Sequence, residues 1–204
     1  MCRSRLAVVI VSAAVVIGSV GLCCMLARAA TPAAALSRDD RAPLVEFTPD
    51  GKLKQPIGYR KWVYVGTPLT PNDLNGGEAS FPEFHAVYID PESFAYYEKT
   101  GEFRDGCVMI KELSSVGYKE APSGKGYFMG EFTGLEAAVK DSKRFKDEPG
   151  HVAYFSFGHK YPLKAEVAMK PTSACNKCHQ DNAQKDWVFT QYYPVLRAAA
   201  PHSK

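Results

Sequence analysis

A short motif near the C-terminus, Cys175-Asn176-Lys177-Cys178-His179, constrains this chain more than any other feature of its sequence. Two thiols three residues apart lie on one side of a helical turn, and the histidine follows the second thiol directly. This spacing lets both thiols reach one edge of a haem while the histidine lies under the iron, as in c-type haem attachment. We therefore expect haem c bonded to Cys175 and Cys178, with His179 as axial ligand.

Three other uses of the motif remain open but are less well supported. A redox dithiol is typical of a thioredoxin-like βαβ arrangement, which this sequence does not predict. A zinc site usually has a second pair of ligands, and the chain has no second C-x-x-C. A disulfide between Cys175 and Cys178 gives His179 no role.

The first 29 residues have the layout of a secretory signal. Arg3 and Arg5 precede an apolar run, Leu6–Leu26, which ends at the small-residue site Ala27-Arg28-Ala29. The run is also long enough for an uncleaved membrane anchor, and its paired cysteines raise a weaker lipoprotein alternative. Because c-type haem is attached outside the cytoplasm, we expect a cleaved signal and a periplasmic protein.

The charge balance changes once this segment is removed. Of the 25 Lys and Arg residues, Arg3, Arg5 and Arg28 lie in the signal, which leaves 22 against 22 Asp and Glu. No basic stripe then remains to neutralise phosphates, so we expect no nucleic-acid partner.

The rest of the chain divides into a flexible lead-in, residues 30–44, and one domain, residues 45–204. Apolar alternation and turn residues predict five strands, at 61–66, 84–89, 107–113, 127–132 and 151–157. Helical signals predict three helices: one from Pro91 to about Gly101, one over 133–145, and a short one capped by Thr172 or Ser173 that carries the cysteine motif. Turns and short helices between strands predict an α+β domain built on an antiparallel sheet.

Two charged residues stand out in these elements. Lys111 shares a strand face with apolar neighbours such as Met109 and Leu113. The simplest interpretation is an edge strand from which Lys111 extends to water. The simplest interpretation of Glu136 is that it forms a capping box with Thr133 at the start of the predicted helix.

The ligand on the other side of the iron is not fixed by spacing. A Met or His there makes an electron carrier, whereas an open position allows chemistry. Six residues are candidates, each more often a packing or surface residue: Met109, Met129, Met169, His85, His151 and His159.

With these residues in view, the chain resembles the cytochrome P-460 family from about Val45 to Ala199. The resemblance lies in long, ordered segments besides the haem motif: Tyr59–Gly66, Tyr88–Ser93, Thr100–Leu113, Gly126–Gly130, Gly134–Phe145 and Val188–Arg197. Two positions depart from a relative, which has arginine at His85 and threonine at Cys107.

The resemblance implies a periplasmic mono-haem enzyme that oxidises hydroxylamine to nitrous oxide or nitrite at an open iron site. Lys111 matches the lysine that the family cross-links to the haem ring, and Glu136 matches its carboxylate above the iron, which accepts protons from substrate. An exported cytochrome would accept the electrons, and the protein would be a homodimer. The alternatives are a gas-binding protein of the cytochrome c′-beta type, without the cross-link, and a simple electron carrier.

Overall fold

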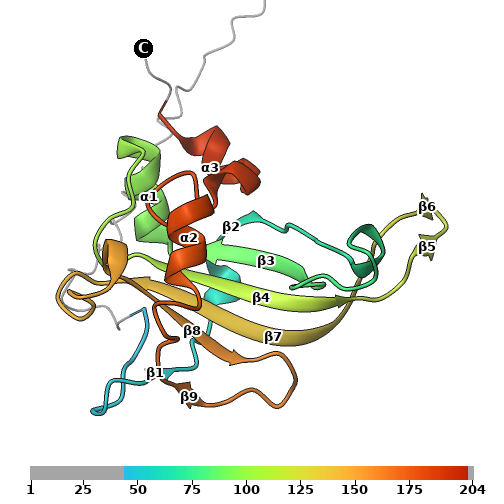
Figure 1. Cartoon of the computed structure of the whole chain (residues 1–204). Coiled ribbons are helices and arrows are strands. Elements are labelled where there is room, and N and C mark those ends of the chain that lie inside the picture. Colours follow the sequence, from blue (N-terminus) through green and yellow to red (C-terminus); the bar gives the residue numbers. More distant parts are fainter. Residues whose placement is uncertain (1–43, 202–204) are drawn as a thin grey trace, which may run out of the picture. The chain divides into compact units, whose positions relative to one another are not determined.

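A computed structural model describes residues 44–201, and its centre is a five-stranded antiparallel sheet in the order β2-β3-β4-β7-β8 (Figure 1). The expected signal, residues 1–29, and the lead-in up to residue 43 lie outside the described residues. Within 44–201, no helix combines the length and apolarity needed to cross a membrane. The five strands are β2 (Val63–Gly66), β3 (Phe84–Ile89), β4 (Val108–Val116), β7 (Met129–Lys140) and β8 (Val152–Gly158).

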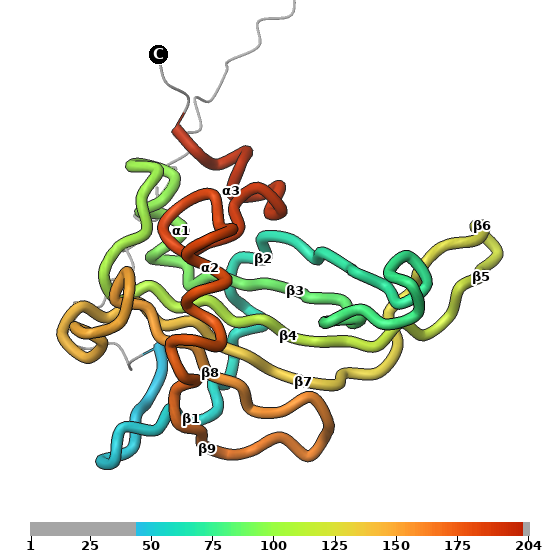
Figure 2. Tube along the Cα trace, viewed as in Figure 1, coloured from blue at the N-terminus to red at the C-terminus, as the bar shows by residue number. Residues whose placement is uncertain are grey.

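Smaller elements surround this sheet. Strand β1 (Leu53–Lys54) pairs with β9 (Glu166–Val167), and β5 (Glu120–Ala121) pairs with β6 (Gly124–Lys125) in a hairpin beyond β4 and β7 (Figure 2). The helices are α1 (Pro91–Thr100), α2 (Asn176–Asn182) and α3 (Pro194–Ala199), with 3₁₀ turns η2 (Tyr59–Lys61), η3 (Asn72–Leu74), η4 (Pro149–His151) and η5 (Thr190–Tyr192). The predicted α+β architecture on an antiparallel sheet is confirmed.

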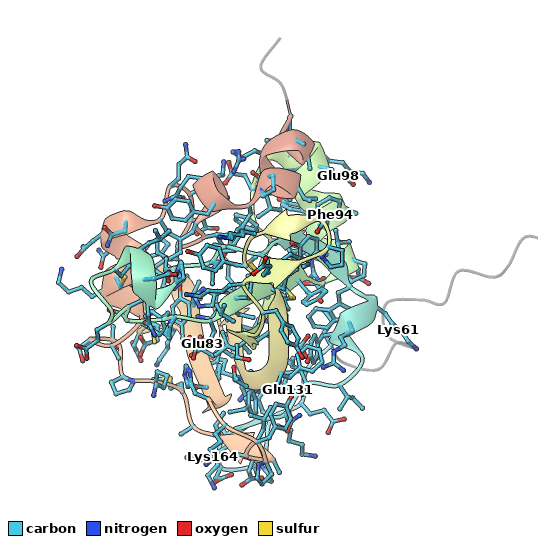
Figure 3. All side chains as sticks on the ribbon, turned by 90° about the vertical axis from the view of Figure 1, so that its right-hand side faces the viewer. Lys61, Glu83, Phe94, Glu98, Glu131 and Lys164 are labelled. Carbon is cyan, nitrogen blue, oxygen red and sulfur yellow. The ribbon has the colours of Figure 1, made fainter. Side chains whose placement is uncertain are left out.

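The sheet has two buried faces because alternate residues of each strand point to opposite sides. On β4, Val108 and Ile110 belong to one core cluster, which also contains Leu53 of β1. Met109 belongs to a second cluster with Leu196 of α3. Side chains fill much of the space between the ribbons (Figure 3), and the second cluster joins Leu196 of α3 to Val65 of β2 and Val87 of β3.

Helix α1 begins and ends where its sequence signals predict. The Asp90 carboxylate accepts a hydrogen bond from the Ser93 backbone N–H at 2.9 Å, and Pro91 takes the first helical position. Gly101 ends the helix with φ of 70°, a conformation that glycine adopts without steric cost. Asp90 is fully buried, and its second oxygen accepts from the Val108 N–H, which ties the helix to β4.

The predicted helix over 133–145 is wrong, because most of this segment is strand β7. It pairs with β4 on one side and β8 on the other. Its burial has a period of two, with Leu135, Ala137 and Val139 in the core. The capping box at Glu136 is therefore wrong as well, since Glu136 lies in the middle of a strand and faces the other side of the sheet.

Two further sequence interpretations need correction. Strand β4 is the central strand of the sheet, so Lys111 does not lie at an edge. The helix of the cysteine motif begins at Asn176 after Cys175, later than a cap at Thr172 or Ser173 would place it.

Candidate haem-binding site

A cavity of about 490 Å³ lies between the sheet, α2 and the segment after α2. This is within the range of roughly 300–1,000 Å³ found for small-molecule and cofactor pockets. Its wall brings together all five residues that the sequence singled out, from β4, β7 and the cysteine motif at α2: Lys111, Glu136, Cys175, Cys178 and His179.

The strand register explains why Lys111 and Glu136 meet. Lys111 on β4 is directly opposite Glu136 on β7, and Glu136 is opposite Ser156 on β8. The next row on the same face holds Met109 and, opposite it, Ala138. Both rows line the cavity, so its sheet wall has a polar row beside an apolar one.

Helix α2 is held against β8 by a residue inside the cysteine motif. The Asn176 side chain is buried, and its Nδ2 donates a 2.7 Å hydrogen bond to the Val152 carbonyl oxygen. This anchor fixes the helical turn on which Cys175 and Cys178 lie. Cys175 lines the cavity, and burial raises the pKa of its thiol. Cys175 and Cys178 are both free thiols.

The ring of His179 is oriented by its surroundings. Its Nδ1 lies 2.7 Å from the Trp187 carbonyl oxygen, and because a carbonyl only accepts, Nδ1 carries the proton. Tyr154 and Phe189 pack on the ring, with centroids 4.4 and 4.6 Å away. Burial lowers the pKa of His179, so the ring is neutral at neutral pH and its Nε2 has a lone pair available for a metal.

The loop that supplies this carbonyl has an unusual backbone. Asp186 and Trp187 both have positive φ, 46° and 61°, which non-glycine residues rarely adopt. Lys140 on β7 contacts the Asp186 carboxylate at 2.5 Å. Gly150 leaves room for the indole ring, because a Cβ there would lie 2.4 Å from Trp187. Sequence reasoning missed this loop, since only the adjacent His179 gave a signal.

Lys111 is neither fully buried nor free in solvent. Its ammonium contacts the Glu136 carboxylate and lies 5.2 Å from the centre of the Phe81 ring. Burial raises the pKa of Glu136, but the charge and hydrogen bond of Lys111, with smaller effects of His159 and His85, lower it more. The net pKa of Glu136 lies below its usual value, so this carboxylate is charged at neutral pH.

Two of the six candidates for a further iron ligand line the cavity within the described chain, His85 and Met109. Burial and the charge of Lys111 lower the pKa of His85 to about 4, so this ring is neutral. Its Nε2 is buried without a hydrogen-bond partner in residues 44–201. His85 therefore offers an unused polar atom to whatever occupies the cavity.

The residues of the cavity fit a c-type haem. Two thiols on one helical turn, a neutral histidine with its Nδ1 already bonded, and a largely apolar wall match what such a group needs. The zinc alternative finds no support, because no three His, Cys, Asp or Glu side chains among residues 44–201 are arranged to hold a metal ion.

Comparison with known proteins agrees with this geometry. A family model described as Cytochrome P460 matches residues 56–190, about two thirds of the chain, and the match includes the five site residues predicted from the sequence. A search of curated proteins found no match.

Proposed function

Because the chain belongs to the cytochrome P460 family, we propose that it oxidises hydroxylamine, with nitrous oxide or nitrite as product. Membership makes the chain a c-type haem cytochrome and implies oxidoreductase chemistry. The substrate, the covalent bonds to the haem and the residue roles belong to the proposal.

One observation carries the proposal: Lys111 and Glu136 meet on the wall of the cavity that also holds the cysteine motif. A protein that only binds a gas or transfers electrons needs neither an amine nor a carboxylate in a largely apolar wall. Burying such groups costs free energy unless they are paired or used. Their presence supports an enzyme over these two alternatives.

In the proposed enzyme, Cys175 and Cys178 hold the haem, His179 binds its iron, and Lys111 is cross-linked to the ring. The bound haem supplies an iron that binds small nitrogen compounds and accepts electrons. Glu136, charged at neutral pH, accepts the protons that hydroxylamine loses on oxidation. The neutral His85 donates or accepts a hydrogen bond to the substrate through its unpartnered Nε2.

A Lys111 bond to the haem would also change Glu136. The free ammonium is the main cause that lowers the pKa of this carboxylate. An amine bonded to an aromatic ring is not protonated at neutral pH. Burial, which raises the pKa, would then be opposed only by the smaller effects of His159 and His85. The cross-link would thus make Glu136 a stronger base at the pH where the enzyme works.

The remaining expectations complete the proposal. The protein would be exported to the periplasm, pass its electrons to an exported cytochrome and act as a homodimer. Detergent-free release from the periplasm would support export over an uncleaved anchor.

The test is the optical spectrum of the purified, reduced protein, followed by hydroxylamine consumption with an artificial electron acceptor. A main band displaced to the red of ordinary c-type haem, with turnover, is the expected result. A peptide map should then show the Lys111 peptide joined through one haem to the peptide with Cys175 and Cys178. An ordinary spectrum without turnover would favour a gas-binding or electron-carrying protein instead.

A further inference from the structure

A histidine beyond the predicted site lies between two carboxylates, one of which is Glu136. The Nε2 of His159 is 3.2 Å from Oε1 of Glu136, and its Nδ1 is 3.6 Å from Oε1 of Glu83. His159 follows β8, and Glu83, labelled in Figure 3, lies just before β3. Each ring nitrogen of His159 therefore faces a different carboxylate.

The two oxygens of Glu136 have different partners. Lys111 contacts Oε2, from the neighbouring strand β4, whereas His159 faces Oε1. Glu136 can therefore keep its contact with Lys111 while it exchanges a proton through the other oxygen.

The backbone is built to bring His159 close to Glu136. The register of β7 and β8 shifts between Leu135 and Glu136. Gly134 on β7 has no side chain, and a Cβ there would lie 2.5 Å from the Gly158 carbonyl oxygen and 3.1 Å from Cα of His159. This close approach of the two strands requires glycine at position 134.

His159, in the middle of this row of side chains, is its most exposed member. Glu136 and Glu83 are 20% and 17% exposed, whereas His159 is 43% exposed. The second oxygen of Glu83 is buried and has no hydrogen-bond partner in residues 44–201, so it can accept a proton or a hydrogen bond. The row thus leads from the cavity wall to solvent through an imidazole, the side chain best suited to carry protons near neutral pH.

We propose that His159, oriented by Glu83, carries protons from Glu136 to solvent. Glu136 gives the proton it has taken from substrate to the lone pair on Nε2 of His159, whose Nδ1 carries a proton. The resulting imidazolium releases its Nδ1 proton to Glu83 or water, and no electron moves in either step. The inference rests on the proposed function, since it assigns the exit of the protons that hydroxylamine oxidation releases.

His159 acts through Glu136 and is a positioning residue, so the test must separate proton transfer from structure. The other titratable groups that face this pair are Lys111, His85 and Glu83. The variant His159→Gln keeps hydrogen bonding but cannot carry a proton. Lys160→Gln, at the exposed neighbouring residue, is the matched control.

The experiment measures hydroxylamine turnover by the haem-loaded protein with saturating electron acceptor. We expect His159→Gln to lower kcat at least about tenfold, within the effect of general acid–base groups, with KM unchanged. Added 2,4,5-trimethylimidazole, whose methyl groups hinder binding to iron, should restore the rate. The haem reduction potential at the pH of the assay, which is an equilibrium property, should stay close to that of wild type, and Lys160→Gln should behave like wild type.

An unchanged kcat in His159→Gln, or a loss that the added base does not restore, would overturn the role of His159. Failure of the proposed function looks different, because wild-type protein would then not oxidise hydroxylamine at all. Glu136→Gln distinguishes the proton acceptor from the proton carrier. This variant should lose activity that no added base restores, since it removes the group that contacts substrate.

Discussion

Lys111 and Glu136 stand directly opposite each other on the central strands β4 and β7, and their charged groups are in contact on the wall of the cavity. Their side chains are 27% and 20% exposed. The charge of Lys111 lowers the pKa of Glu136, so a change at Lys111 must be interpreted through its effect on both residues.

The cross-link is tested by Lys111→Arg, which keeps the positive charge beside Glu136 but removes the amine. We expect haem to stay attached through Cys175 and Cys178, while the reduced spectrum moves to that of ordinary c-type haem. The measurement is the reduced spectrum with a peptide map of the haem fragment. If the variant kept the wild-type spectrum, the red shift would not come from Lys111.

The same variant also tests the coupling to Glu136. In Lys111→Arg the retained charge keeps the pKa of Glu136 low, so activity should persist down to below the ordinary carboxyl value of 4.5. The proposed cross-link removes the charge of the amine in wild type, so activity there should fall at a higher pH as Glu136 becomes protonated. The pH profile of kcat/KM in both proteins measures this difference, and coincident profiles would contradict it.

The proton-accepting role predicts that Glu136→Gln slows turnover by roughly 10²-fold or more, as expected for loss of a general base. The haem spectrum should stay nearly unchanged, because glutamine fills the same space and still accepts a hydrogen bond from Lys111. Turnover at the wild-type rate would remove Glu136 from the proton path.

Much of the fold followed from local signals, and the main error has a clear cause. Strand β3 and helix α1 were predictable because alternation, Asp90 and Gly101 act within a few residues of sequence. The segment that forms β7 contains residues compatible with the period of a helix and with that of a strand. Pairing with β4 and β8 decides that it is a strand. Such partners are remote in sequence, so tertiary pairing overrode local helix propensity.

The candidate site divides in the same way. The cysteine motif carries its own spacing, and Lys111 was visible as a charge on an apolar face. The Trp187 carbonyl gave no signal, because a backbone acceptor has no sequence signature. His159 was only one of six candidates for an iron ligand, and its place beside Glu136 depends on the approach of two strands at Gly134.

The variant Gly150→Ala tests whether the loop with Trp187 orients His179. A Cβ at Gly150 would collide with the Trp187 ring, so Gly150→Ala should displace the loop that binds His179. Gly76→Ala is the matched control, since Gly76 has φ of 66° against 65° for Gly150 but nothing within 4 Å. Both variants carry about 1 kcal/mol of left-handed strain, and Gly150→Ala should lose roughly 1–3 kcal/mol more from overpacking. Denaturant unfolding measures the loss, and a shifted reduction potential in Gly150→Ala alone would show that the loop acts on His179.

His85 predicts how stability depends on pH. Its pKa is lowered from 6.5 to about 4, so the unfolded chain binds a proton that the folded protein excludes between these values. The free energy of unfolding should therefore fall as pH drops from about 6.5 to about 4, by roughly 1–2 kcal/mol after allowance for partial exposure. Denaturant unfolding of haem-loaded protein measures this slope, which should be smaller in His85→Gln. An equal slope in both proteins would assign the pH dependence to other groups.

The two middle residues of the cysteine motif should respond differently to substitution. Asn176 is 1% exposed and donates to the Val152 carbonyl oxygen, whereas Lys177 is exposed and pairs with Asp181 on the same helix. Asn176→Ala leaves a buried carbonyl without its donor, which costs about 1–3 kcal/mol, whereas Lys177→Ala removes a surface pair that contributes roughly 0.3–0.5 kcal/mol. Because Asn176 holds α2 on β8, its loss should also lower the fraction of protein with haem bound through both thiols, measured as the haem-to-protein ratio. Equal ratios in the two variants would mean that the spacing of the thiols and His179 suffices for attachment, without the anchor to the sheet.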